Sequence, residues 1–103
     1  MKLTNKLIGK HVIVRSRNEG LNFGKLLKAD KNGCVIGGAR RLWYTKPAVD
    51  GFSWYEGVAK VGVSHDSKVS VEVKAKVIVE DYSITVCSKE AVSNIYKHPS
   101  HNE

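Results

Sequence analysis

The sequence predicts a mainly β, α+β domain: a small antiparallel sheet, curled or closed into a barrel, with one short mid-chain helix and a C-terminal helix. Three observations support this prediction. Short runs of branched residues alternate with polar residues, which is typical of half-buried strands. Turn residues separate neighbouring runs at hairpin spacing. Two stretches place apolar residues at helical spacing, one just past the middle of the chain and one near the C-terminus.

The first half of the chain predicts four strands. They are expected at residues 11–17, 21–29, 34–36 and 39–44. Residues 30–33 are a strong turn signal, because asparagine tolerates the left-handed conformation and glycine adopts it freely. Residues 21–36 are therefore expected to form a hairpin. The adjacent glycines Gly37 and Gly38 are expected to bend the chain between the third and fourth strands.

The second half predicts two helices and three more strands. The strands are expected at residues 69–73, 75–79 and 82–87. A short helix is expected at residues 54–60, capped by Ser53. Ser88 is expected to cap a final helix that runs to about Lys97 and ends before Pro99. The paired acids Glu80 and Asp81 are expected in a solvated turn.

The chain of 103 residues predicts one globular domain at residues 11–97, after a basic lead-in at 1–10 and before a disordered tail at 98–103. No apolar run approaches the ~20 residues that a membrane span needs, and no signal peptide is visible, so we expect a cytoplasmic protein without membrane contact. Cys34 and Cys87 are expected to be buried and reduced, although the sequence leaves a disulfide open.

The formal net charge of +7, from 17 basic and 10 acidic residues, favours anionic partners such as nucleic acid, nucleotides or an acidic protein surface. The cysteines and histidines lack zinc spacing, and no cofactor motif is present, so neither a metal nor a cofactor is expected. Residues 64–67 hold serine, histidine and aspartate, but triad members normally come from separate elements. We therefore expect a protein that is not an enzyme.

The best binding candidate is the segment 37–44, which combines two glycines, two arginines and two aromatic residues. Strand alternation places Arg41 and Trp43 on one face, and Arg40, Leu42 and Tyr44 on the other. Arg41 beside Trp43 predicts an exposed cationic and aromatic surface, because arginine binds anions in a fork and stacks on rings. In the alternative, Trp43 belongs to the core and Arg40 caps the sheet edge.

Guanidinium groups and aromatic rings are the features that bind phosphates and stack on bases. The candidate ligand-binding residues are Arg40, Arg41 and Trp43, followed by Arg15, Arg17 and Tyr44. Trp54 and Tyr55, at the start of the mid-chain helix, are further aromatic candidates. The alternative for Trp43, Trp54 and Tyr55 is that they fill the core, as large aromatic residues in small domains often do.

Four segments, at residues 9–15, 20–24, 39–44 and 83–87, resemble a family of small, uncharacterised tailed-phage proteins. The resemblance covers residues 7–95, and its most distinctive part is the Ala-Arg-Arg-Leu-Trp segment at 39–43. It implies a phage-encoded accessory protein of the host cytoplasm that acts by binding. The implied classes are a sponge for a nucleotide immune signal, a nucleic-acid-binding barrel, or a protein inhibitor of a host enzyme.

Among these classes we favour a homo-oligomer that sequesters an anionic signal, such as a cyclic nucleotide, and thereby counters host defence. The expected mechanism is stoichiometric: guanidinium forks hold the phosphates and a ring stacks on the base. Oligomerisation also suits a chain with exposed strand edges, because pairing covers them.

Overall fold

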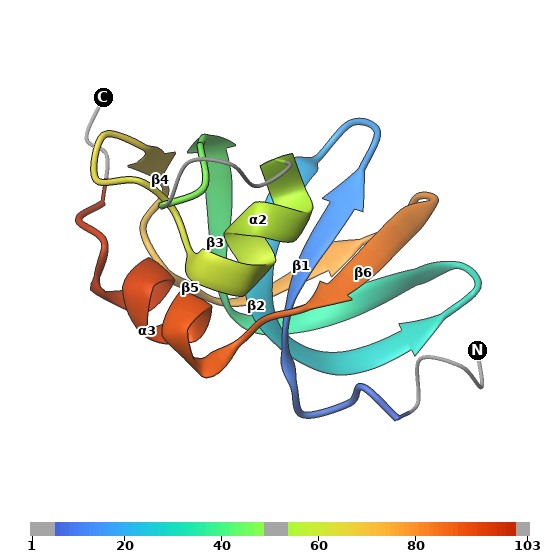
Figure 1. Ribbon diagram of the computed structural model, residues 1–103. Helices are drawn as coiled ribbons and strands as arrows, with labels where there is room; N and C mark the ends of the chain where they lie inside the picture. Colours follow the sequence, from blue (N-terminus) through green and yellow to red (C-terminus); the bar gives the residue numbers. More distant parts are fainter. Residues whose placement is uncertain (1–5, 49–53, 101–103) are drawn as a thin grey trace.

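A curled antiparallel sheet and two short helices make up the protein (Figure 1). The computed structural model describes residues 6–48 and 54–100. The strands are β1 (His11–Ser16), β2 (Gly20–Asp30), β3 (Gly33–Tyr44), β4 (Lys68–Val69), β5 (Val73–Ile78) and β6 (Tyr82–Val86). The helices are α2 (Trp54–Val61) and α3 (Lys89–Lys97). The mainly β prediction, with a short mid-chain helix and a C-terminal helix, is confirmed.

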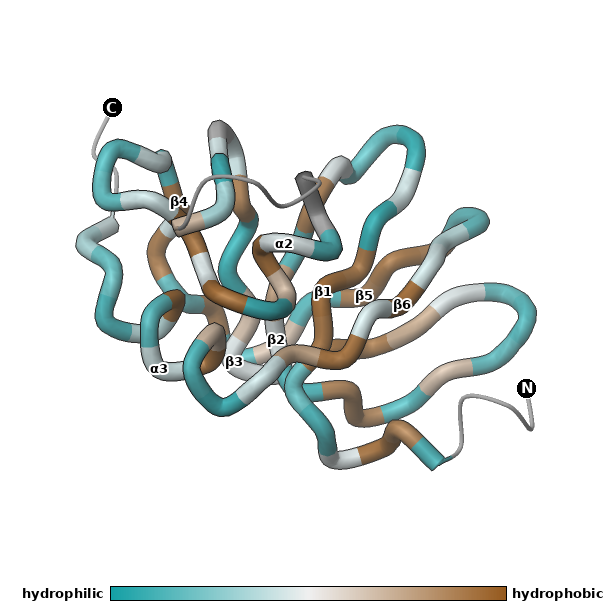
Figure 2. Tube along the Cα trace, viewed as in Figure 1, coloured by the Kyte–Doolittle hydropathy of each residue, from teal (hydrophilic) through white to brown (hydrophobic). Residues whose placement is uncertain are grey.

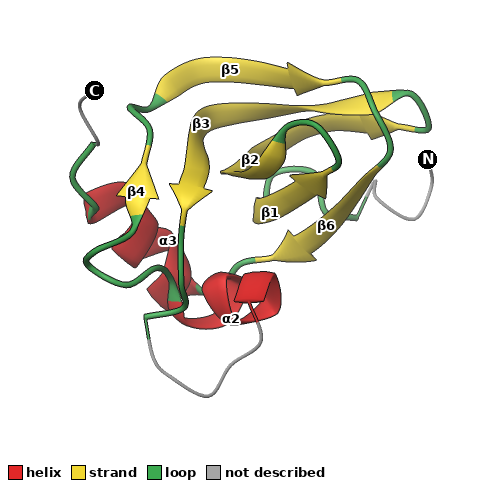
Figure 3. Cartoon of the chain, turned by 90° about the horizontal axis from the view of Figure 1, so that it is seen from above, coloured by secondary structure: helices red, strands yellow, loops and turns green. Residues whose placement is uncertain are grey.

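The sheet curls without closing. Its order is β4-β3-β2-β1-β6, and β5 pairs with β3 beside β4. The two ends of the sheet therefore approach each other at β5 and β6, but no strand pairing within the described residues joins them (Figure 3). A short turn connects β5 to β6, because β6 begins only a few residues after β5 ends.

The two strands predicted at 34–36 and 39–44 are one continuous strand, β3. The expected bend is present as a β-bulge, because the pairing of β2 with β3 shifts register between Phe23 and Lys25. Gly38 takes a φ of +54° at this point, a conformation that glycine adopts without steric cost. The bulge bends β3, but β3 remains hydrogen-bonded to β2 on both sides of the bulge.

The strand predicted at 69–73 is wrong. The chain pairs with β3 through β4 and again through β5, and residues 70–72 between them leave the ladder. Ser70 holds this break in place: its hydroxyl accepts from the Arg41 N–H at 2.7 Å, and its N–H donates to the Arg41 carbonyl at 2.9 Å. The regular alternation therefore did not produce a half-buried strand, and Val71 is 62% exposed.

The sheet has an apolar core on each side. The helix-side core contains Ile13, Leu21, Phe23, Leu42, Val58, Ala59, Val63, Val69 and Ile95. The barrel-side core, inside the curl of the sheet, contains Val12, Val14, Leu26, Ala29, Cys34, Ile36, Ala39 and Ile78. Because β1 contributes alternate residues to both cores, it reads as a continuous apolar run (Figure 2).

Both cysteines are free thiols, which settles the question of a disulfide. Cys34 lies in the barrel-side core, and Cys87 packs against the helix-side core. Burial raises the pKa of the Cys34 thiol to about 11 and that of the Cys87 thiol to about 12. Both groups are therefore protonated at neutral pH and pack as small apolar side chains.

Helix α3 begins and ends as the sequence predicts. The Ser88 hydroxyl accepts from the Ala91 N–H at 3.0 Å, and Ala91 and Ile95 are buried. The predicted cap of α2, Ser53, lies outside the described residues. None of the helices in the described part of the chain is long and apolar enough to cross a membrane.

Candidate anion-binding surface

Arg41 and Trp43 lie together on one face of β3, at the end of the strand that extends past the barrel-side core. Both side chains are exposed, and Trp43 keeps 51% of its surface. Leu42 between them points the other way and is 3% exposed. The alternation predicted from the sequence is present from Arg40 to Leu42, and beyond it the pairing of β3 with β4 shifts register between Leu42 and Tyr44. Because Trp43 is exposed, the alternative that buries it in the core is wrong.

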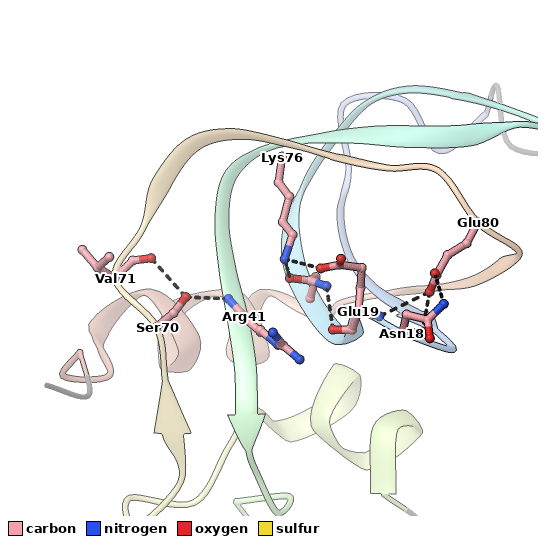
Figure 4. A network of polar contacts seen from close by, with 8 residues as sticks. Asn18, Glu19, Arg41, Ser70, Val71, Lys76 and Glu80 are labelled. Atoms are coloured by element: carbon pink, nitrogen blue, oxygen red, sulfur yellow. Dashed lines mark hydrogen bonds and ion pairs between the residues drawn. The ribbon is translucent and has the colours of Figure 1, made fainter. Parts of the chain in front are cut away.

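The backbone of Arg41 is held on both sides. It pairs with Asn22 of β2, and it exchanges two hydrogen bonds with Ser70. Figure 4 shows the one that the Arg41 N–H donates to the Ser70 hydroxyl. Within the described residues, the guanidinium of Arg41 takes part in no hydrogen bond or ion pair. A cationic group thus extends from a fixed strand, which is the arrangement that preorganises an anion site.

Arg40 has the opposite environment, although it is the next residue. It is 3% exposed. Its guanidinium donates to the carbonyls of Ser70 at 2.8 Å, Ile95 at 2.6 Å and His98 at 2.7 Å, and to the Ser100 hydroxyl at 3.2 Å. Burial lowers the pKa of this guanidinium. Its donors are used within the protein, so the prediction that Arg40 contacts a ligand is wrong, and its role is structural.

Arg40 also accounts for the path of the chain after α3. His98 and Ser100 belong to the segment that the sequence assigns to a disordered tail, yet both contact Arg40, and Ser100 forms a β-bridge with Val69. The described chain therefore stays on the fold as far as Ser100. Residues 101–103 of the predicted tail and residues 1–5 of the predicted lead-in lie outside the described residues.

Arg15 lies on the other face of the sheet from Arg41. Cross-strand partners share a face, and Arg15 pairs with Leu21, which in turn pairs with Leu42. Leu42 alternates with Arg41 along β3. The sheet thus separates the guanidinium of Arg15 from the surface formed by Arg41 and Trp43, and the structure does not bring all the predicted residues into one site.

Arg15 and Arg17 instead line an open groove at the end of β1, with a volume of about 600 Å³. The same groove is lined by Asp81, Tyr82 and Ser83. The carboxylate of Asp81 offsets part of the positive charge there, so this groove is a less favourable anion site than the surface on β3. The side chains of Tyr44, Trp54 and Tyr55, also predicted as candidates, lie outside the described part of the structure.

A network that the sequence did not reveal lies beside Arg41. The Lys76 ammonium donates to the Asn22 side-chain oxygen at 2.9 Å and forms an ion pair with Glu19 at 2.9 Å (Figure 4). Asn22 is fully buried, and its amide donates to the Glu19 carbonyl at 3.3 Å. The Glu19 carboxylate is thus paired with Lys76, and within the described residues it forms no ion pair with Arg41. The only sequence signal was a lysine that alternates with apolar residues in β5.

Glu80 was expected in a solvated turn, but it binds the β1–β2 turn. Its carboxylate accepts from the Asn18 N–H at 2.7 Å, the Asn18 amide at 2.9 Å and the Glu19 N–H at 3.3 Å (Figure 4). The nearby Ser16 hydroxyl, together with these donors on Asn18 and Glu19, lowers the pKa of Glu80 to about 2. The Ser16 hydroxyl has no partner at hydrogen-bond geometry, so the hydrogen bonds that hold the Glu80 carboxylate in place are those from Asn18 and Glu19.

This depressed pKa predicts an acid-labile link between the two turns. A carboxyl group with a lowered pKa stabilises the fold above its ordinary pKa of 4.5 and loses that contribution as the pH falls toward 2. The free energy of unfolding should therefore decrease between about pH 5 and pH 2. Replacing Glu80 with glutamine should flatten this dependence in urea titrations at several pH values. An unchanged slope in the variant would contradict the assignment.

Residues 64–67, which contain the residue types of a hydrolase triad, form a turn. The Ser64 hydroxyl donates to Asp66 at 2.5 Å and lies 3.0 Å from the Ser67 hydroxyl. The Ser67 hydroxyl also accepts from the Lys46 N–H at 3.2 Å, so these serine and aspartate side chains hold the loop in place. Within residues 6–48 and 54–100, no group of three or more histidine, cysteine, aspartate or glutamate side chains is placed to hold a metal ion.

Comparison with known proteins identifies a family. The model of a domain of unknown function, DUF6948, matches residues 9–95, which is most of the chain. The chain belongs to the DUF6948 family. No curated protein and no solved structure matches it. The matched residues run from the start of β1 into α3, so the DUF6948 domain includes the Arg41–Trp43 surface and the α3 residue that binds Arg40.

Proposed function

We propose that this DUF6948 protein is a non-enzymatic binding protein for an anion that carries a planar ring, and that a nucleotide is its simplest ligand. One observation carries the proposal: Arg41 and Trp43 are exposed side by side on a fixed strand, with the adjacent Glu19 carboxylate already paired. A guanidinium binds phosphate in a fork, and an indole stacks on a base. The net charge of +7 attracts such ligands to the surface.

The wider role follows from the resemblance to tailed-phage proteins and stays a prediction. In that role the protein sequesters a nucleotide signal of host immunity in the host cytoplasm, in a stoichiometric complex. A stoichiometric binder needs no catalytic group, and the support for it is the same pair of side chains. Binding of single-stranded nucleic acid is the second candidate, because a stacking ring beside a cation also suits a polynucleotide.

Tryptophan fluorescence tests the proposal directly. The chain has two tryptophans, so a Trp54→Phe variant reports on Trp43 alone. Titration with cyclic dinucleotides and ADP-ribose derivatives should quench the emission and saturate. Arg41→Ala should raise the Kd by about 10- to 100-fold, because a hydrogen bond to a charged group contributes about 1.5–3 kcal/mol. Trp43→Ala in the wild-type background, measured by calorimetry, should lose about 1–3 kcal/mol of stacking.

Three matched controls keep the result specific. Lys97→Ala removes one positive charge at the end of α3, and it should leave the Kd unchanged. Arg17→Ala removes a guanidinium from the groove on β1, and a larger loss there than with Arg41→Ala would assign the site to the groove. A short single-stranded DNA that binds, with an affinity that falls steeply with salt, while every nucleotide fails would favour the polynucleotide. A folded protein that binds none of these ligands would overturn the proposal.

A further inference from the structure

The outer side of β5 carries an apolar surface that faces solvent. It consists of Leu27, Val35, Ala75, Val77 and Val79, which we call the β5 outer face. Leu27 is 48% exposed, Val77 is 60% exposed and Val79 is 77% exposed. The alternating residues Cys34, Ile36 and Ile78 point into the barrel-side core. The strands here are thus apolar on both sides, although no element of the described chain covers the outer one.

Strand pairing makes the β5 outer face continuous across three strands. Val35 of β3 pairs with Val77 of β5. One row further along, Gly37 pairs with Ala75, and Leu27 of β2 packs so closely on Gly37 that an added Cβ would lie 2.9 Å from its methyl group. A contiguous apolar surface of this kind is typical of an association site, whereas single exposed apolar residues are not.

The charges beside this face are of both signs, which favours a partner that also carries both signs. Lys28 and Asp30 lie two residues apart on β2 and line the same shallow hollow of about 220 Å³ as Val35, Val77 and Val79. A uniformly acidic partner would meet Asp30 with a like charge, and a uniformly basic partner would meet Lys28 with one. A second copy of this chain, related by a two-fold axis between the two charges, brings each lysine to the other copy's aspartate.

We propose that two copies of the protein form a dimer through the β5 outer face, with reciprocal Lys28–Asp30 contacts across the axis. The dimer places apolar face against apolar face, as in packed sheets. It uses the outer side of the sheet. Arg41 lies on the opposite face of the sheet, which it shares with its strand partner Asn22. A variant of the β5 outer face therefore leaves the Arg41 surface unchanged, and dimerisation and ligand binding can be measured independently.

Sedimentation velocity of the purified full chain over a wide concentration range tests the dimer. We expect a species of twice the 11.4 kDa chain mass that dissociates on dilution. Val77→Lys should leave only monomer. Lys28→Glu and Asp30→Lys should each raise the dimer Kd about tenfold or more, and the double variant should restore dimerisation, because the swapped charges again face each other. Circular dichroism verifies folding, in particular for Asp30→Lys, which removes the acceptor of the Asn32 N–H.

Val86→Lys is the matched control. Val86 is an exposed valine of β6, outside the β5 outer face, with 42% of its surface exposed. This variant should dimerise as the wild type does, and its dissociation would place the contact elsewhere and overturn the proposal. A wild-type protein that stays monomeric at every concentration overturns it as well. A dimer that Val77→Lys dissociates, but that ignores both charge reversals, contradicts the two-fold arrangement.

Discussion

Replacing Arg40 with methionine is expected to lower the free energy of unfolding by about 3–5 kcal/mol, because it removes a charged donor from three carbonyls, one buried and two partly buried, and each lost hydrogen bond of this kind costs about 1–3 kcal/mol. These carbonyls belong to Ser70, Ile95 and His98, so the loss is felt in the β4–β5 connection and at the end of α3. A domain with a total stability of about 5–15 kcal/mol would lose much of it. Urea denaturation followed by circular dichroism measures the effect.

The matched control for this prediction is the neighbouring Arg41→Met. Arg41 is exposed, so its replacement should change the free energy of unfolding by less than about 0.5 kcal/mol. The same substitution in adjacent residues thus separates a structural arginine from a candidate ligand-binding one. Equal destabilisation by both variants would contradict the assignment of roles, and so would a stable Arg40→Met protein.

Replacing Gly62 with alanine is expected to cost about 3–4 kcal/mol, combining about 1–2 kcal/mol of backbone strain with the loss of two hydrogen bonds. Gly62 has a φ of +86°, and an added Cβ would lie 2.3 Å from the Asn94 Cγ. Asn94 cannot move away freely, because its side chain accepts from the Val63 N–H at 2.7 Å and donates to the Val63 carbonyl at 3.1 Å. The methyl group must therefore displace the link between α3 and the segment after α2.

Gly9→Ala is the control for the strain alone. Gly9 has a φ of +90°, close to that of Gly62, and nothing lies within 4 Å of the position of an added Cβ. This variant should lose only about 1–2 kcal/mol. Thermal and urea unfolding of the two variants, measured side by side, give the contribution of the Asn94 contact as their difference. A difference near zero would show that Asn94 moves aside without cost.

The local signals in the sequence predicted most of the elements. Three features depend only on neighbouring residues and can therefore be predicted without the fold: the turn at residues 30–33, the cap at Ser88 and the alternation from Arg40 to Leu42. The break at residues 70–72 is different. It depends on hydrogen bonds between Ser70 and Arg41, which are distant in the sequence, and no local pattern reports them.

The candidate site shows the same division. Strand alternation separated Arg40 from Arg41, but it did not say which of the two faces the helices would cover. Arg15 joined the list of candidates because its charge suits phosphate, and only the pairing of Leu21 with Leu42 shows that it lies across the sheet. The ion pair of Lys76 with Glu19 joins β5 to the β1–β2 turn, a contact that the order of residues does not encode.

The pairing of the strands has a consequence for the order of folding. The β2–β3 hairpin joins neighbouring segments, so its loop closes quickly and at little entropic cost. The pairing of β1 with β6 joins segments from opposite ends of the domain, and it orders the long intervening chain only when that chain has collapsed. The β1–β6 pairing is thus expected to form last. During synthesis, β6 must leave the ribosome before this pairing can complete the sheet.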